Sequence, residues 1–123
     1  MSVPILRFGD VLIASIQLAQ TDAELLALRD RLAGQVGDAR ARGVIIDVSA
    51  LDVMDSFATR TLRAIAYSSR LRGAHTIVVG ISPEVAFSMV QLGLELGAVS
   101  TALDLDDAIA QIEERRRSQQ RRD

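Results

Sequence analysis

The sequence predicts a single-domain α/β protein in which a largely parallel, mixed β-sheet, opened by a β-hairpin, is covered by about four α-helices. Two observations support this class. Short apolar segments rich in valine and isoleucine alternate along the chain with amphipathic segments, in the order β-β-α-β-α-β-α-β-α. Alternation of this kind is typical of a sheet whose strands are joined by right-handed helical crossovers. A length of 123 residues is enough for one such core.

The composition excludes several classes of protein. The chain has no cysteine, so it has neither a disulfide framework nor a thiol nucleophile. His75 is the single histidine, which rules out a histidine metal cluster. Four aromatic residues provide no platform for stacking bases. No segment resembles a signal peptide or a membrane span, and we expect a cytoplasmic protein.

The N-terminal part predicts a β-hairpin followed by a helix. Residues 5–8 and 11–16 are apolar strand segments, and the pair Gly9-Asp10 between them favours a tight turn. Helix one is expected to start at Thr21, whose hydroxyl can accept from the amide of Glu24 while the glutamate carboxylate reaches back. Its buried stripe is expected to consist of Leu25, Leu28, Leu32, Val36 and Ala39.

The run Val-Ile-Ile-Asp-Val at residues 44–48 predicts a central strand. It is apolar without alternation, as expected for a strand covered on both faces, and Gly43 before it fits the stop of the preceding helix. After a short acidic turn, residues 56–72 predict a second helix. Its buried face is expected to hold Ala58, Thr61, Leu62, Ile65, Ala66 and Ser69. Its opposite face carries Ser56, Arg60, Arg63, Tyr67 and Arg70.

The second half of the chain predicts two further strands and two further helices. Residues 76–79 form a β-branched strand, and Ser82-Pro83-Glu84 is a strong helix start. The helix at about 83–92 is expected to present Ala86, Met89, Val90 and Gly93 along one side. A strand near 100–103 leads to the last helix, which is expected to bury Leu105, Ala108, Ile109 and Ile112.

Charge is distributed unevenly along the chain, whose formal net charge is −2. Residues 115–123 hold five arginines and one aspartate, a local charge of +4, which leaves −6 for residues 1–114. A folded domain with this negative charge binds nucleic acid poorly. The basic segment is most simply a helix end that frays into solvent.

The turn between the central strand and the second helix contains three residues whose side chains could cap the helix, bind a metal or react: Asp52, Asp55 and Ser56. It follows the carboxyl end of a parallel strand, where functional groups collect in such sheets. Three alternatives are open: Ser56 caps the helix, the two aspartates hold Mg²⁺, or Ser56 is a nucleophile. The missing flanking glycines and the placement of His75 on another strand argue against the nucleophile.

The element order and the Asp-Ser turn in Val-Met-Asp-Ser-Phe-Ala-Thr-Arg, residues 53–60, resemble the STAS domain of anti-sigma-factor antagonists. Among these, the turn is most similar to that of the RsbS-type stressosome scaffold proteins. The resemblance covers nearly the whole chain and implies a STAS domain at residues 1–116 with a basic, disordered tail at 117–123. It also implies that Ser56 is the phosphoacceptor and Asp55 its acidic neighbour, in a protein that is not an enzyme and needs no cofactor or metal.

The resemblance further implies a change of partners on phosphorylation. The phosphate would release a serine/threonine kinase of the RsbT type from a surface made of Asp55, Ser56, Phe57, Thr59, Arg60, Arg63 and Tyr67. Other implied partners are an RsbR-like STAS co-antagonist and an RsbX-type phosphatase, in a homo- or hetero-oligomer without nucleic acid or membrane. One alternative is a sporulation-type antagonist that binds an anti-sigma kinase directly. Another is an assembly module that presents some of Val85, Phe87, Leu92, Leu94 and Leu96 to a partner.

Overall fold

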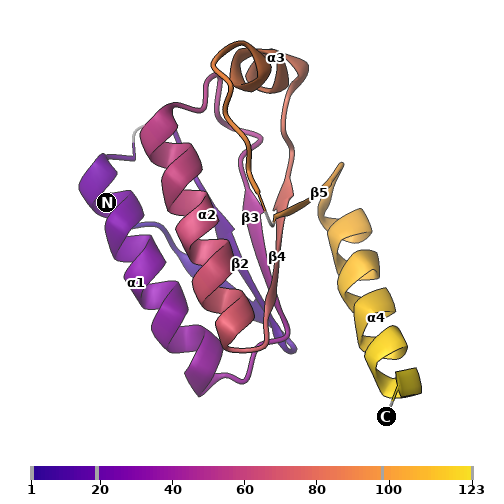
Figure 1. The fold of residues 1–123 in the computed structure, drawn as a ribbon. Coiled ribbons are helices and arrows are strands. Elements are labelled where there is room, and N and C mark those ends of the chain that lie inside the picture. The colour runs from indigo at the N-terminus through magenta and orange to yellow at the C-terminus, as the bar shows by residue number, and fades with distance from the viewer. Residues whose placement is uncertain (1, 19, 98, 123) are drawn as a thin grey trace.

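The computed structural model describes residues 2–18, 20–97 and 99–122, and it contains a five-stranded sheet with the spatial order β1-β2-β3-β4-β5 (Figure 1). The strands are β1 (Ile5–Phe8), β2 (Val11–Ser15), β3 (Gly43–Asp47), β4 (His75–Val79) and β5 (Ser100–Ala102). β1 pairs antiparallel with β2, and every later pair is parallel. The predicted mixed sheet with an opening hairpin is confirmed.

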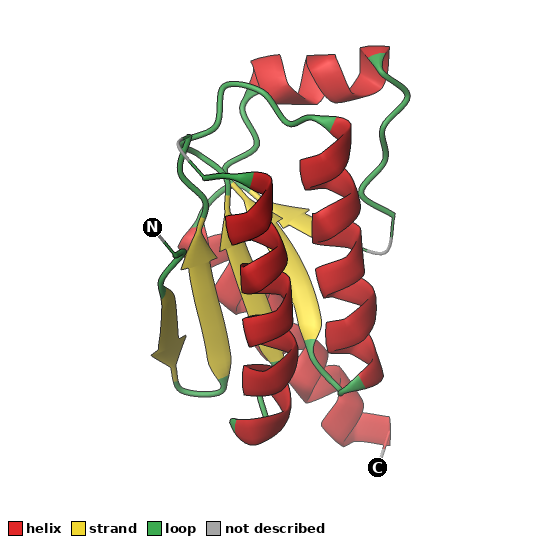
Figure 2. Cartoon of the chain, turned by 90° about the vertical axis from the view of Figure 1, so that its left-hand side faces the viewer, coloured by secondary structure: helices red, strands yellow, loops and turns green. Residues whose placement is uncertain are grey.

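Helices lie on both faces of this sheet (Figures 1 and 2). α1 (Asp22–Asp38) and α2 (Ser56–Leu71) lie side by side on one face, and α4 (Leu105–Arg122) lies on the other. The short helix α3 (Pro83–Gln91) sits beyond the carboxyl ends of the strands. None of the helices in the described ranges is long and apolar enough to cross a membrane.

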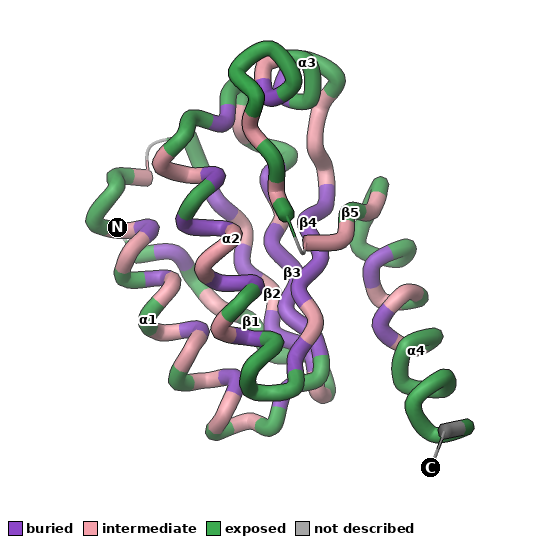
Figure 3. Tube along the Cα trace, viewed as in Figure 1, coloured by how far each residue is buried: buried purple, intermediate pink, exposed green. Residues whose placement is uncertain are grey.

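Strand β3 is the centre of the core (Figure 3). Val44 and Ile46 pack with the apolar side chains of α1 and α2, whereas Ile45 packs with Ala108 and Ile112 of α4. All three β3 side chains are fully buried. Coverage on both faces explains why this segment has no polar alternation, as the sequence indicated.

The helix starts follow the predicted capping chemistry. Thr21 Oγ1 accepts a hydrogen bond from the Glu24 amide at 3.1 Å, and Glu24 Oε1 accepts one from the Thr21 amide at 3.2 Å. Ser82 Oγ accepts from the Val85 amide at 3.1 Å, with Pro83 at the first helical position. Both predicted helix starts are confirmed.

Gly43 has a different role from the one predicted. α1 already ends at Asp38, and the chain then turns through Arg40, which has a φ of 49°. Gly43 is the buried first residue of β3, and a Cβ there would collide with the Ile112 side chain of α4. The glycine therefore permits the close approach of α4 to the sheet rather than the end of α1.

The stripe predicted along α3 and the core stripe predicted for α4 are only partly buried in the structure. α3 buries Val85 and Met89, while Ala86 and Val90 face solvent, because this helix crosses the end of the sheet and touches the core along one narrow line. In α4 the side chain of Leu105 is 42 % exposed, and burial begins at Ala108.

The basic C-terminal segment is helical where a disordered tail was expected. α4 continues to Arg122, and the expected tail at 117–123 is therefore helical as far as the structure describes it. Two pairs at i,i+3 spacing support this part of the helix, Glu113 with Arg116 at 3.9 Å and Glu114 with Arg117 at 2.9 Å.

Candidate phosphorylation and docking site

Ser56 is the first residue of α2, and it follows a loop that starts where β3 ends. The loop is anchored at both ends. Asp47 Oδ1 accepts a hydrogen bond from the Ser49 amide at 2.9 Å, and the Met54 side chain is fully buried in the core. The serine is thus exposed on a turn that the core holds in place.

Asp55, and not Ser56, caps α2. Its backbone is extended, and its Oδ1 accepts a hydrogen bond from the Ala58 amide at 2.8 Å. In the described part of the chain the Ser56 hydroxyl forms no hydrogen bond. The alternative in which Ser56 serves merely as the helix cap is therefore wrong, and its hydroxyl is available to another molecule.

The helix start is also suited to an anion. The first amides of an α-helix have no partner within the helix, and its dipole places a partial positive charge there. A phosphate on Ser56 would lie beside this end of α2, with Arg60 exposed one turn further along. Asp55 and Asp52, both exposed, add negative charge at the same turn.

The exposed face of α2 is close to the predicted one. Arg60, Tyr67 and Arg70 are exposed, and Arg63 is half-buried. The loop after α3 passes close to this face, since a Cβ at Gly97 would lie 3.4 Å from Arg63 Cδ and 3.7 Å from Tyr67 Oη. This loop therefore borders the exposed face of α2 at Arg63 and Tyr67.

Thr59 does not belong to that face. Its side chain is 0 % exposed, and its Oγ1 donates to the Asp55 carbonyl at 2.9 Å. The expectation that Thr59 contacts a partner is corrected for this reason. Phe57 is half-buried and packs against the core, so only part of its ring faces outward.

The acids of the turn do not form a metal site in this structure. Within residues 2–18, 20–97 and 99–122, no group of three aspartate, glutamate, histidine or cysteine side chains could hold an ion. One oxygen of Asp55 is already used in capping the helix. Asp47 is likewise bonded within its own loop.

His75 lies at the other end of the sheet from Ser56. It begins β4, whereas Ser56 follows the end of the parallel neighbour β3, and a five-residue strand is about 16 Å long. Its Nε2 is 2.8 Å from Ser100 Oγ. Burial, together with the nearby Arg115 and Arg70, lowers its pKa to about 4. The ring is therefore neutral at pH 7 and too distant to activate Ser56.

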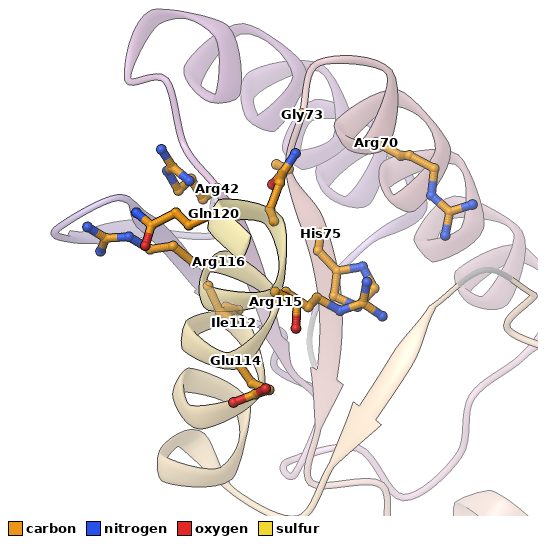
Figure 4. Close-up of a pocket in the computed structure, with 12 residues that line it drawn as sticks. Arg42, Arg70, Gly73, His75, Ile112, Glu114, Arg115, Arg116 and Gln120 are labelled. Atoms are coloured by element: carbon orange, nitrogen blue, oxygen red, sulfur yellow. The ribbon is translucent and has the colours of Figure 1, made fainter. Parts of the chain in front are cut away.

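A groove that was not predicted from the sequence lies at this second end of the sheet and is shown in Figure 4. It has a volume of about 870 Å³ and lies between the C-terminal half of α4 and the segment that leads into β4. Arginines dominate its charged lining, which comprises Arg42, Arg70, His75, Glu114, Arg115 and Arg116. The excess of arginine at 115–122 was its only visible sign in the sequence.

The profile described as "STAS domain" matches residues 7–108. The chain belongs to the STAS family. This agrees with the sheet order and the Asp-Ser turn at the start of α2. The predicted resemblance is confirmed.

Two solved structures are similar to this STAS chain over nearly its whole length. A serine-to-glutamate variant of RsbS from Moorella thermoacetica is 32 % identical with a TM-score of 0.80, covering 94 % of this chain and 97 % of that one. A chain from a structure of the stressosome is 31 % identical to this chain, with a TM-score of 0.76. The stressosome is described there as a signal integration and transduction hub. There the coverage is 93 % of this chain and 99 % of the other.

Longer proteins share part of the sequence. The RsbT co-antagonist protein RsbRD of Bacillus subtilis (strain 168) is 33 % identical over 67 residues, which are 54 % of this chain and 24 % of RsbRD. RsbRC from the same organism is 37 % identical over 65 residues, or 53 % and 23 % of the two chains. The matched part of this chain thus spans about a quarter of the length of these curated relatives.

Proposed function

We propose that this STAS protein is an RsbS-like regulator that holds a serine/threonine kinase of the RsbT type and releases it when Ser56 is phosphorylated. The observation that carries the proposal is the division of roles at the start of α2. Asp55 caps the helix, so the exposed Ser56 hydroxyl is not needed for the fold. The similarity to RsbS over almost the whole chain supports the same assignment.

Phosphorylation changes the charge of the surface without unfolding the domain. A phosphate adds about −1.5 to −2 charges and three acceptor oxygens at pH 7. The unpaired amides and the dipole at the start of α2 favour this anion, and Arg60 can pair with it. A partner that docks its own carboxylates or apolar groups at this turn is repelled by the added charge, so the modification weakens binding.

The docking surface combines the turn with the exposed face of α2. It consists of Asp55, Ser56, Phe57, Arg60, Arg63 and Tyr67. Tyr67 is 53 % exposed and supplies an aromatic contact, while the arginines offer donors to acidic groups of the kinase. We leave Thr59 out because it is buried.

The remaining partners follow from the relatives. An RsbR-like STAS protein is proposed as the co-assembling partner, because segments of RsbR-type co-antagonist proteins match this chain and a stressosome chain shares its fold. A phosphatase of the RsbX type would reverse the modification. The protein acts without catalysis of its own, in the cytoplasm, where such a kinase and its substrates meet.

Phosphotransfer tests the site directly. We expect a cognate kinase with ATP to add one phosphate to the wild-type protein and none to Ser56→Ala. Ser49→Ala is the matched control, since Ser49 lies in the same loop but its hydroxyl bonds to Asp47. Intact-mass spectrometry measures the number of phosphates added to each protein. Phosphate on the Ser56→Ala variant, or on Ser49 alone in the wild type, would contradict the assignment.

A sporulation-type antagonist is the second candidate function. It would bind an anti-sigma kinase directly and need no RsbR-like partner. A binding assay in which the chain alone captures the kinase as tightly as the chain mixed with an RsbR-like protein favours this candidate.

A further inference from the structure

α4 carries opposite charges at its two ends. Asp106 and Asp107 lie in its first turn, directly after Asp104. The C-terminal half, from residue 114 to residue 121, is exposed on all sides and includes Arg115, Arg116, Arg117 and Arg121. A helix segment that is polar all round either is stabilised by ion pairs along its own surface, as at Glu113–Arg116 and Glu114–Arg117, or bridges to another domain.

The groove beside this half is basic with an apolar floor. Among the described residues, Arg42, Arg70, Arg115 and Arg116 line it together with the acid Glu114, and the buried Ala74 and Ile112 also line it. The ion pairs of Arg42 and Arg116 are long and exposed, at 3.5 Å to Asp10 and 3.9 Å to Glu113. Arg115 forms none in the described residues and lies beside His75 (Figure 4). The groove therefore keeps an excess of positive charge.

The other end of α4 has the complementary chemistry. In the segment Leu-Asp-Leu-Asp-Asp at 103–107, the residue Leu103 is 88 % exposed. Its backbone is fixed, because Asp104 Oδ1 accepts from the Asp107 amide at 2.9 Å and Asp107 Oδ2 accepts from the Leu103 amide at 3.2 Å. The Asp106 side chain is exposed and forms no hydrogen bond within the described chain. This is a rigid segment of leucines flanked by carboxylates.

We propose that the groove receives the 103–107 segment of a second copy of this chain, so that molecules associate head to tail along α4. Both halves of the contact are on this chain, and they match in charge and in apolar content. An 18-residue helix is about 27 Å long, so its two ends cannot meet within one molecule. The contact joins different surfaces and therefore builds rows or rings rather than a closed two-fold dimer.

The inference goes beyond the kinase switch and uses a different part of the molecule. Ser56 lies at the carboxyl ends of the strands, whereas the groove lies at their amino ends. Changes in the groove should leave phosphorylation of Ser56 intact, which separates the two proposals experimentally.

Sedimentation velocity over a range of protein concentrations tests the contact. We expect the wild-type protein to form oligomers at about 50 mM salt, and we expect these oligomers to dissociate at about 500 mM, because salt screens the attraction between exposed charges. Arg115→Glu and Asp106→Arg should each weaken association by more than about tenfold, since each places like charges opposite one another. Both positions are exposed, and thermal melts check that the variants fold.

Charge exchange provides the decisive control. Mixing R115E with D106R should restore association, because each groove then meets a 103–107 segment of opposite charge. The double variant alone should also associate for the same reason. The proposal is overturned if wild type is monomeric at every concentration and salt, or if the single variants sediment like wild type. It is also overturned if oligomers survive high salt and disappear with Phe87→Ser, since the exposed apolar side of α3 would then be the contact.

Discussion

At the scale of single residues, the start of α2 separates the residue that caps the helix from the exposed serine beside it. The carboxylate of Asp55 accepts the Ala58 amide, so the neighbouring hydroxyl of Ser56 contributes little to the helix. Both residue types are good helix caps, and they are adjacent in the sequence. Which of them caps decides whether the serine can be modified without loss of stability.

Substitution at the two positions should therefore have unequal effects. Asp55→Ala is expected to lower the free energy of unfolding by about 1 kcal/mol, because the helix loses its cap. Asp55→Asn should retain most of the stability, and Ser56→Ala should be nearly neutral. Urea denaturation followed by circular dichroism measures all three. A cost for Ser56→Ala as large as that for Asp55→Ala would show that the serine supports the fold after all.

His75 gives a prediction about pH. The pKa of His75 is lowered from 6.5 to about 4, first by burial and then by Arg115 and Arg70. The unfolded chain consequently binds a proton more readily than the folded one between these values, and stability falls as the pH is lowered below 6.5. Because the ring is half-exposed, we expect a loss of about 1 kcal/mol at most.

The control for this effect is His75→Gln, which can still hydrogen-bond to Ser100 but does not titrate. Melting temperatures of wild type and variant, compared between pH 7 and pH 4, isolate the histidine from the carboxylates. If the difference between the two proteins does not change with pH, His75 is not responsible.

At the scale of elements, the position of α4 depends on one glycine. Gly43 begins β3 without a side chain, and the methyl end of Ile112 occupies the space where a Cβ would be. The apolar contact between β3 and α4 is buried from both sides. The packing of α4 on the sheet is therefore sensitive to a single methyl group added at position 43.

Gly43→Ala is expected to lower the free energy of unfolding by about 1–3 kcal/mol through overpacking. The cost should shrink in an Ile112→Val background, because valine lacks the methyl group nearest to the new Cβ. Gly34→Ala is the matched control. It lies in α1 with no atom near its Cβ position, and the same change there should stabilise the protein by about 0.5–1 kcal/mol. Equal effects at the two glycines would contradict this packing.

At the scale of the whole molecule, the parallel sheet keeps two surfaces apart. The Ser56 turn lies at the carboxyl ends of the strands, and the arginine groove lies at their amino ends. Under the two proposals made above, a kinase at the first end and a neighbouring copy at the second would not compete for the same surface. The fold is thus suited to a protein that is both a substrate and a building unit.

Much of this architecture could be predicted from local patterns. The apolar run at 44–48 and the capping residues Thr21 and Ser82 are local signals, and the structure contains the elements they predicted. The choice of Asp55 over Ser56 as cap could not be made, since it depends on where the loop leaves β3. Burial of Thr59 and the groove beside Arg115 arise only when distant segments pack together.

The affinity of the kinase for phosphorylated and unphosphorylated protein tests the central claim most directly. Calorimetric titration of one cognate kinase would be done with wild type, with wild type phosphorylated on Ser56, and with Ser56→Asp, using Ser49→Asp as the control for charge in the loop. We predict that the phosphate weakens binding by at least about tenfold, which corresponds to 1.4 kcal/mol, and that Ser56→Asp does so in the same direction while Ser49→Asp does not. Equal affinity for the phosphorylated and unphosphorylated forms would contradict the switch.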